Sequence, residues 1–209
     1  AISQSPAADF AKARRDKVAV AFPNQIVVIE AGAPKTRSND TEYRYRPHAA
    51  FAHLTGWGSE TVPDSVLVID TKESTQILFL RPTAGKDSDE FFANPAIGEF
   101  WVGARPTLDD VSSLLGIETR DLKDLSAYLD KKKTISLEDS ELAQFVSELR
   151  LVKDSYEIDQ MRQAVASSIR GFEDIVKALP KAAKNPRGER IIETAFFARA
   201  RLEGNDLGY

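Results

Sequence analysis

The chain has 209 residues and a formal net charge of −4, with 42% hydrophobic and 29% charged residues. These proportions argue against intrinsic disorder, and the dispersed lysines and arginines give no reason to expect a nucleic-acid partner. No apolar run approaches the ~20 residues of a membrane span, and the N-terminus is too polar for a signal peptide. The absence of cysteine favours a cytoplasmic protein without disulfides or thiolate metal sites.

The N-terminal 80 residues predict a helix, three strands and one long loop. The signals are a cap and first-turn proline before the helix, continuous β-rich runs in the strands, and a short polar turn between the last two strands. In chain order we expect a helix from Ser5 and Pro6 to about Phe22, a buried strand at 25–30, a polar loop at 31–47, and an antiparallel hairpin of Ser65–Asp70 with Thr75–Leu80.

Helices dominate the next 70 residues. Residues 81–105 are rich in loop-forming residues, and Thr107 with Asp110 then opens a helix that ends near Gly116. We expect a further helix at 122–131, a strand at 134–137 and a helix at 138–150. Strands that alternate with helices, together with one hairpin, predict an α/β domain with a mixed β-sheet. The runs at 26–29, 66–69 and 77–80 are expected to form its central strands.

A domain boundary is predicted near Val152 to Ser155, which divides the chain into residues 1–152 and 153–209. Asp154 and Glu157 form a capping pair for a long helix that we expect Pro180 to stop. A last helix, closed by Gly204, carries an apolar face that needs a partner surface, formed by Ile191, Ile192, Ala195, Phe196, Ala198 and Leu202.

No self-contained active site is evident in the sequence. The only two histidines, His48 and His53, are five residues apart, a spacing that would point their rings away from each other on a helix. The chain has no cysteine and no G-x-S-x-G motif for a nucleophile. Gly56-Trp57-Gly58 lacks the pattern of a phosphate loop, and we expect a turn that packs Trp57 against the sheet.

The stretch Thr36–Tyr45 (TRSNDTEYRY) is unusually dense in functional groups. It contains two arginines, two tyrosines and two carboxylates within ten residues. Such a loop can present a surface that binds a polar partner, or it can form an internal ion-pair network that holds the edge of a domain. Both interpretations remain open at this point.

Four motifs in order resemble the aminopeptidase P (Xaa-Pro aminopeptidase) family of pita-bread metallopeptidases. They are TRSNDTEYRYRPHAAFAHLTGW followed by DSVLVID, EFWVG at Glu99–Gly103, ELRLVKDSYEIDQMRQA at Glu148–Ala164, and the closing ETAFFARARLEGNDLGY. The resemblance spans nearly the whole chain and is looser at Pro82–Ile97. It implies a creatinase/aminopeptidase P type N-terminal domain over 1–152, followed at 153–209 by the incomplete beginning of the pita-bread α+β catalytic domain.

The resemblance also implies an activity. Family members are metal-dependent exopeptidases that remove an N-terminal residue when proline is second, using two divalent ions, usually manganese. The metal ligands, two aspartates, a histidine and two glutamates, lie C-terminal to the motif that ends at Tyr209. We therefore expect no catalytic residue and no bound metal in this chain, which would serve in assembly and at the rim of the active site, with a homo-oligomer (dimer or tetramer) as the working form.

Four positions match family residues near the substrate cleft. Asp40 matches an aspartate at the active-site edge, and Trp101 matches a tryptophan that reaches a neighbouring subunit's cleft in tetrameric members. Arg150 matches an arginine at the domain junction, and Tyr209 a tyrosine near the metals. Alternatives of the same fold are a prolidase, a creatinase-like hydrolase, or a non-catalytic pita-bread module that binds peptides or proteins.

Overall fold

The computed structural model describes residues 2–206. The chain forms two compact units, residues 1–152 and residues 153–209, and each is described by itself.

The first unit is built on a four-stranded mixed sheet with the strand order β1-β4-β5-β6. Strands β1 (Ile26–Glu30), β4 (Val66–Asp70) and β5 (Thr75–Leu80) pair antiparallel, with Val68 opposite both Val28 and Ile77. Strand β6 (Glu118–Asp121) pairs parallel to β5. The predicted α/β class with a mixed sheet is confirmed.

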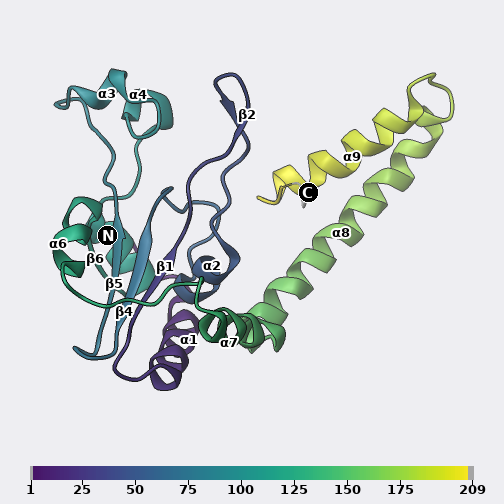
Figure 1. Cartoon of the computed structure of the whole chain (residues 1–209). Coiled ribbons are helices and arrows are strands. Elements are labelled where there is room, and N and C mark those ends of the chain that lie inside the picture. The colour runs from purple at the N-terminus through teal and green to yellow at the C-terminus, as the bar shows by residue number, and fades with distance from the viewer. Residues whose placement is uncertain (1, 207–209) are drawn as a thin grey trace. The chain divides into compact units, whose positions relative to one another are not determined.

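Helices cover both faces of this sheet (Figure 1). Because side chains alternate along a strand, Val27 and Ile29 face one layer and Ile26 and Val28 face the other. The first face packs against α1 (Ala8–Ala21), α2 (Ala49–Thr55), α5 (Leu108–Leu115) and α7 (Ser140–Leu151). The second face packs against the 3-10 helix η1 (Leu122–Asp124) and α6 (Leu125–Leu129). Trp57, 2% exposed, lies in the first core, as predicted.

Two buried arginines of α1 hold the C-terminal end of α2. Arg14 Nη1 donates to the His53 carbonyl oxygen (2.8 Å), and Arg15 Nη1 donates to the Leu54 carbonyl oxygen (2.9 Å). Arg15 Nε also donates to Gln76 Oε1 on β5 (2.7 Å). Burial lowers the pKa of Arg15 to about 10, against an opposing effect of neighbouring Asp16, so the guanidinium remains charged at neutral pH. These bonds satisfy carbonyls that the end of a helix leaves open.

Several local predictions are wrong in the first unit. The expected strand at 134–137 is only an isolated bridge between Ile135 and Val27, and the run at 26–29 forms an edge strand of the sheet instead of a central one. The N-terminal helix begins at Ala8 because the Ser5 carbonyl and hydroxyl accept from the amides of Ala8 and Ala7 in a preceding turn. Ordered elements also interrupt both predicted loops: β2 (Thr36–Ser38), β3 (Thr41–Glu42), α3 (Glu90–Ala93) and α4 (Glu99–Val102).

The second unit is a pair of helices, α8 (Ser155–Ala182) and α9 (Gly188–Leu202). The predicted capping box of Asp154 and Glu157 starts α8. Pro180 does not stop the helix, because a proline in the last turn removes only one backbone donor, and α8 continues to Ala182. The helices approach closely at Gly171, where a Cβ would lie 2.7 Å from the Phe196 ring. In residues 2–206 no helix is both long and apolar enough to cross a membrane.

Candidate functional site

Asp40 lies at the tip of an exposed hairpin formed by β2 and β3. The turn residues are Asn39 and Asp40, and Asn39 adopts a positive φ of 49°, which asparagine tolerates well. All residues from 36 to 44 are exposed, so the hairpin presents its polar groups to solvent. The hairpin is therefore a surface element of the first unit.

The base of the hairpin is anchored to the chain that leaves β1. The Tyr43 amide donates to the Lys35 carbonyl oxygen (2.9 Å), and the Tyr45 hydroxyl donates to the Gly32 carbonyl oxygen (2.8 Å). Burial, and secondarily the charge of Asp64, raise the pKa of Tyr45 to about 12. The phenol is therefore a neutral donor at physiological pH and holds the hairpin in place.

Trp101 belongs to an exposed cluster of four aromatic rings, which we call the aromatic knob and define as Phe91, Phe92, Phe100 and Trp101 on α3 and α4. Phe92, Phe100 and Trp101 are 62%, 55% and 58% exposed. The ring centroids of Phe92 and Phe100 lie 4.7 Å apart, and those of Phe100 and Trp101 lie 5.1 Å apart. Trp101 Nε1 donates to the Phe92 carbonyl oxygen at 2.8 Å, so α3 fixes the orientation of the indole.

The aromatic knob depends on a glycine and an ion pair. Gly98 precedes α4 and lies against the backbone of α3, where an added Cβ would be 2.3 Å from the Phe91 carbonyl oxygen. Arg81, just after β5, donates to both carboxylate oxygens of Glu90 at 3.0 Å. Hydrogen bonds from Asn94 and then from Arg81 lower the pKa of Glu90, which keeps this carboxylate ionised.

Topology brings the hairpin and the aromatic knob to the same end of the sheet. Strands β1 and β5 both pair antiparallel with β4, so they run in the same direction. The β2–β3 hairpin follows β1, and α3 and α4 follow β5. Both segments therefore leave the sheet at the same end and project beyond it, as Figure 1 shows. The segments that carry Asp40 and Trp101 thus lie beyond the same end of the sheet in the first unit.

The two remaining expected site residues are Arg150 and Tyr209. Arg150 lies in the last turn of α7, and its Nη1 donates to the Val146 carbonyl oxygen at 3.2 Å. Tyr209 lies outside the described residues. The phenylalanines that support Trp101 were not predicted. The FF pair in EFFANP was the signal available, but it falls where the family resemblance is loosest.

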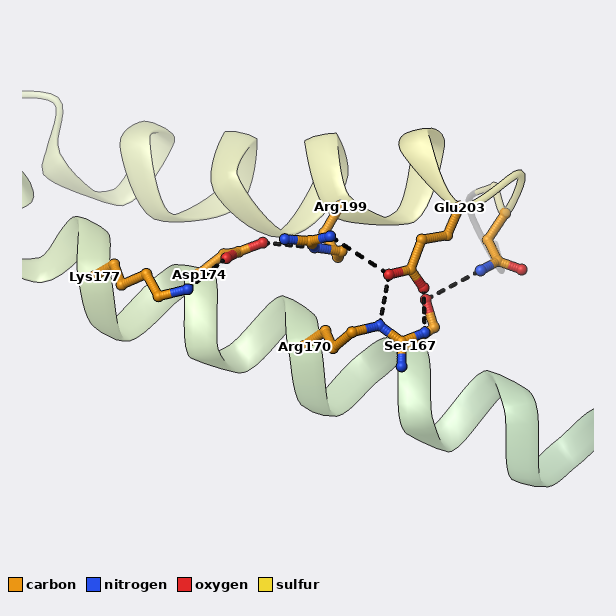
Figure 2. A network of polar contacts seen from close by, with 7 residues as sticks. Ser167, Arg170, Asp174, Lys177, Arg199 and Glu203 are labelled. Atoms are coloured by element: carbon orange, nitrogen blue, oxygen red, sulfur yellow. Dashed lines mark hydrogen bonds and ion pairs between the residues drawn. The ribbon is translucent and has the colours of Figure 1, made fainter.

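A polar network joins the two helices of the second unit (Figure 2). Arg170 on α8 donates to both carboxylate oxygens of Glu203 at 2.6 Å, and Arg199 on α9 donates to Asp174 at 2.7 Å. The Arg170 hydrogen bond is the largest of the effects that lower the pKa of Glu203 to about 2. The network fixes the register of the two helices.

Residues 2–206 contain no group of three or more histidine, aspartate or glutamate side chains arranged to hold a metal ion. His48 instead caps α2, because its Nδ1 accepts a hydrogen bond from the Ala50 amide at 3.1 Å. This bond places the proton of the neutral imidazole on Nε2.

Comparison with known proteins relates both units to one family. Residues 11–138 match the family model described as "Aminopeptidase P, N-terminal domain". The chain is 39% identical over 219 residues to Xaa-Pro aminopeptidase 1 of Streptomyces coelicolor, a match that covers 94% of this chain and 43% of the relative. It is 35% identical over 224 residues to Xaa-Pro aminopeptidase 2 of the same organism, with 97% and 46% covered.

The fold agrees with these matches. Aminopeptidase P from E. coli with the inhibitor Pro-Leu superimposes with a TM-score of 0.67 at 19% identity, over 96% of this chain and 51% of that chain. The present chain spans less than half the length of the two curated relatives named above. On the sequence matches, the chain belongs to the aminopeptidase P family and contains its N-terminal domain.

Proposed function

We propose that this chain is the N-terminal part of an Xaa-Pro aminopeptidase, which releases the N-terminal residue of peptides whose second residue is proline. The observation that carries the proposal is the 39% identity to Xaa-Pro aminopeptidase 1, which extends over 94% of the chain and so includes both units.

The catalytic centre belongs to the part of the protein beyond this chain. A pair of divalent ions, manganese in our proposal, would supply an activated water for attack on the Xaa-Pro carbonyl carbon. Residues 2–206 offer no cluster of ligands for such ions. The role of this chain is then to support assembly and to line the rim of the substrate cleft.

Peptide hydrolysis tests the proposal. The 209-residue chain is expected to show no hydrolysis of Xaa-Pro-Xaa tripeptides with added Mn²⁺, and calorimetric titration is expected to show no stoichiometric Mn²⁺ binding. The full-length protein that carries this chain is expected to hydrolyse the same peptides, with the S. coelicolor enzyme as positive control. If hydrolysis scales with the concentration of the 209-residue chain in a preparation free of longer protein, the proposal that the catalytic centre lies outside this chain is wrong. Preference of the full-length protein for free Xaa-Pro dipeptides would identify a prolidase instead.

We assign Asp40 and Trp101 to the cleft rim because both are exposed and project from the same end of the sheet. In the full-length protein, Trp101→Ala is expected to lower kcat/KM for longer peptides at least about tenfold while the melting temperature stays within a few degrees. Trp101→Phe, which keeps a ring but loses the bond to Phe92, should retain more activity. A large loss of stability with normal kinetics would make Trp101 a structural residue.

A homo-oligomer, dimer or tetramer, is part of the same proposal. An exposed aromatic cluster is typical of surfaces that contact another protein, and the aromatic knob has three rings more than half exposed. Light scattering of the full-length protein tests the oligomer, and Phe100→Ser should shift it toward monomer if the aromatic knob forms the contact. A cytoplasmic setting also belongs to this proposal, and cell fractionation tests it.

A further inference from the structure

A cleft of about 560 Å³ opens in the first unit beside the end of strand β1. Its floor includes Val28, and its walls come from two stretches of chain that are distant in sequence, residues 30–48 and residues 136–138. A volume of this size lies within the range of small-molecule sites in proteins, and it accommodates a peptide of two or three residues. The residues that line it all belong to one unit, so the cleft does not depend on how the two units are arranged.

The cleft is lined by charged groups of both signs. Lys35, Arg46 and His48 contribute cationic or donor groups from the stretch that surrounds the β2–β3 hairpin. The carboxylates come from Glu30 at the end of β1 and from Glu138 in the opposite stretch, where Ser136 adds a hydroxyl. His48 offers a donor because its Nδ1 is occupied by the Ala50 amide and its Nε2 carries the proton. This distribution complements a ligand that bears both a carboxylate and an ammonium group.

The backbone of β1 adds a third feature. The Val28 amide donates to the Ile135 carbonyl oxygen (2.9 Å), and the Ile135 amide donates to the Ile26 carbonyl oxygen (2.9 Å), so the even-numbered residues of β1 direct their backbone groups away from β4. After Ile135 the chain turns away, with the Asp139 amide donating to the Ser136 carbonyl oxygen. Within residues 2–206 no backbone hydrogen bond continues this pairing to Glu30. The Glu30 N–H and C=O therefore form an open strand edge at the cleft.

We propose that this cleft binds a short peptide with free ends, in an extended conformation along the edge of β1. The Glu30 N–H and C=O would pair with the peptide backbone, as in the addition of a strand to a sheet edge. Lys35 binds the peptide carboxylate, and Glu138 with Glu30 binds its ammonium group. The site needs neither metal nor catalysis, so it stands apart from the peptidase proposal.

Titration of the 209-residue chain with trialanine tests this proposal independently of any proline-specific chemistry. The chain should bind trialanine with a dissociation constant below about 1 mM, and amide NMR shifts should be confined to residues near Glu30, Lys35 and Ser136–Glu138. N-acetyl-trialanine and trialanine amide should each bind roughly tenfold more weakly, because each lacks one charged partner. Equal binding of the blocked and free peptides, or shifts scattered over other surfaces, would overturn the proposal.

Variants that remove one charge from the cleft test which residue binds each end of the peptide. Lys35→Gln should weaken binding of free trialanine several-fold, so that trialanine and trialanine amide bind with equal affinity. Glu138→Gln should make trialanine and N-acetyl-trialanine bind with equal affinity. Lys17→Gln and Glu73→Gln are matched controls, because these substitutions change the net charge by the same amounts as the cleft variants. Both residues are exposed and neither lines the cleft. Lys35 and Glu138 are also exposed, so neither substitution should disturb the fold. The amide NMR signals of residues outside the cleft should therefore match those of the unaltered chain. Unchanged selectivity in both cleft variants, or equal losses in the controls, would refute the site.

Discussion

The substitution Gly98→Ala tests how the aromatic knob is held. Gly98 has φ −66° and ψ 125°, which alanine adopts without strain, so any effect of the added methyl group is steric. The new Cβ would lie 2.3 Å, 2.6 Å and 2.7 Å from the carbonyl oxygens of Phe91, Glu90 and Asn94. The shortest of these is about 1 Å below the 3.4 Å at which ordinary contact begins. All three obstacles are backbone atoms, so no side-chain rotation relieves the overlap.

Relief requires α3 to move away from α4. The Gly98 amide donates to the Asn94 carbonyl oxygen at 2.7 Å, and this bond must lengthen or break. Overpacking of this kind costs about 1–3 kcal/mol. A hydrogen bond contributes about 1 kcal/mol more. Because none of the residues of α3 and α4 is buried, we expect most of this cost to appear as local opening of the aromatic knob, while the sheet stays folded.

Tryptophan fluorescence and proteolysis measure this opening. The chain has two tryptophans, and Trp57 is 2% exposed while Trp101 is 58% exposed, so changes in acrylamide quenching report on Trp101. Gly98→Ala should increase quenching and speed chymotrypsin cleavage after Phe91 and Phe92 about fivefold or more. Gly58→Ala is the control, since its Cβ would meet nothing within 4 Å. If Gly98→Ala matches Gly58→Ala in quenching and in cleavage rate, the close approach does not hold the aromatic knob and our reasoning is refuted.

Three further predictions concern stability. Phe51→Ala in the main core should lower the free energy of unfolding by about 3–5 kcal/mol in urea titrations, and a loss below 1 kcal/mol would contradict its complete burial. The pKa of Glu203 is lowered to about 2, so its pairing with Arg170 stabilises the α8–α9 pair fully above the ordinary pKa of 4.5, and this stabilisation is lost as pH falls toward 2. Glu203→Gln should therefore remove the loss of helical circular dichroism signal that occurs between these two pH values. Amide exchange should be slowest in β4 and β5 and faster at Glu30 on the open edge, and equal protection at Glu30 would contradict the open edge.

Elements specified by neighbouring residues were predicted correctly. The capping boxes of Thr107 with Asp110 and of Asp154 with Glu157 are present in the structure, and the hairpin of β4 and β5 has the expected antiparallel pairing. Each of these depends on contacts across a few residues, so a short window of sequence contains the information. The exposure of Trp101 was also predictable, because its segment lies between prolines and glycines and has no apolar periodicity.

Pairings between distant residues could not be predicted in this way. Strand β6 has the polar sequence ETRD and forms only because it lies beside β5, while the more β-like run at 134–137 makes a single bridge with β1. The support of Trp101 by the Phe92 carbonyl and the open edge at Glu30 likewise depend on how remote segments pack. The sequence alone determined the class of fold, the local helix starts and the family resemblance, because these follow from composition, periodicity and short motifs. Only the tertiary structure decided which strand lies at the edge, which groups share one end of the sheet and where a cleft remains. The reason is that several strand pairings are equivalent on local sequence, and backbone hydrogen bonds and steric fit between distant segments select among them.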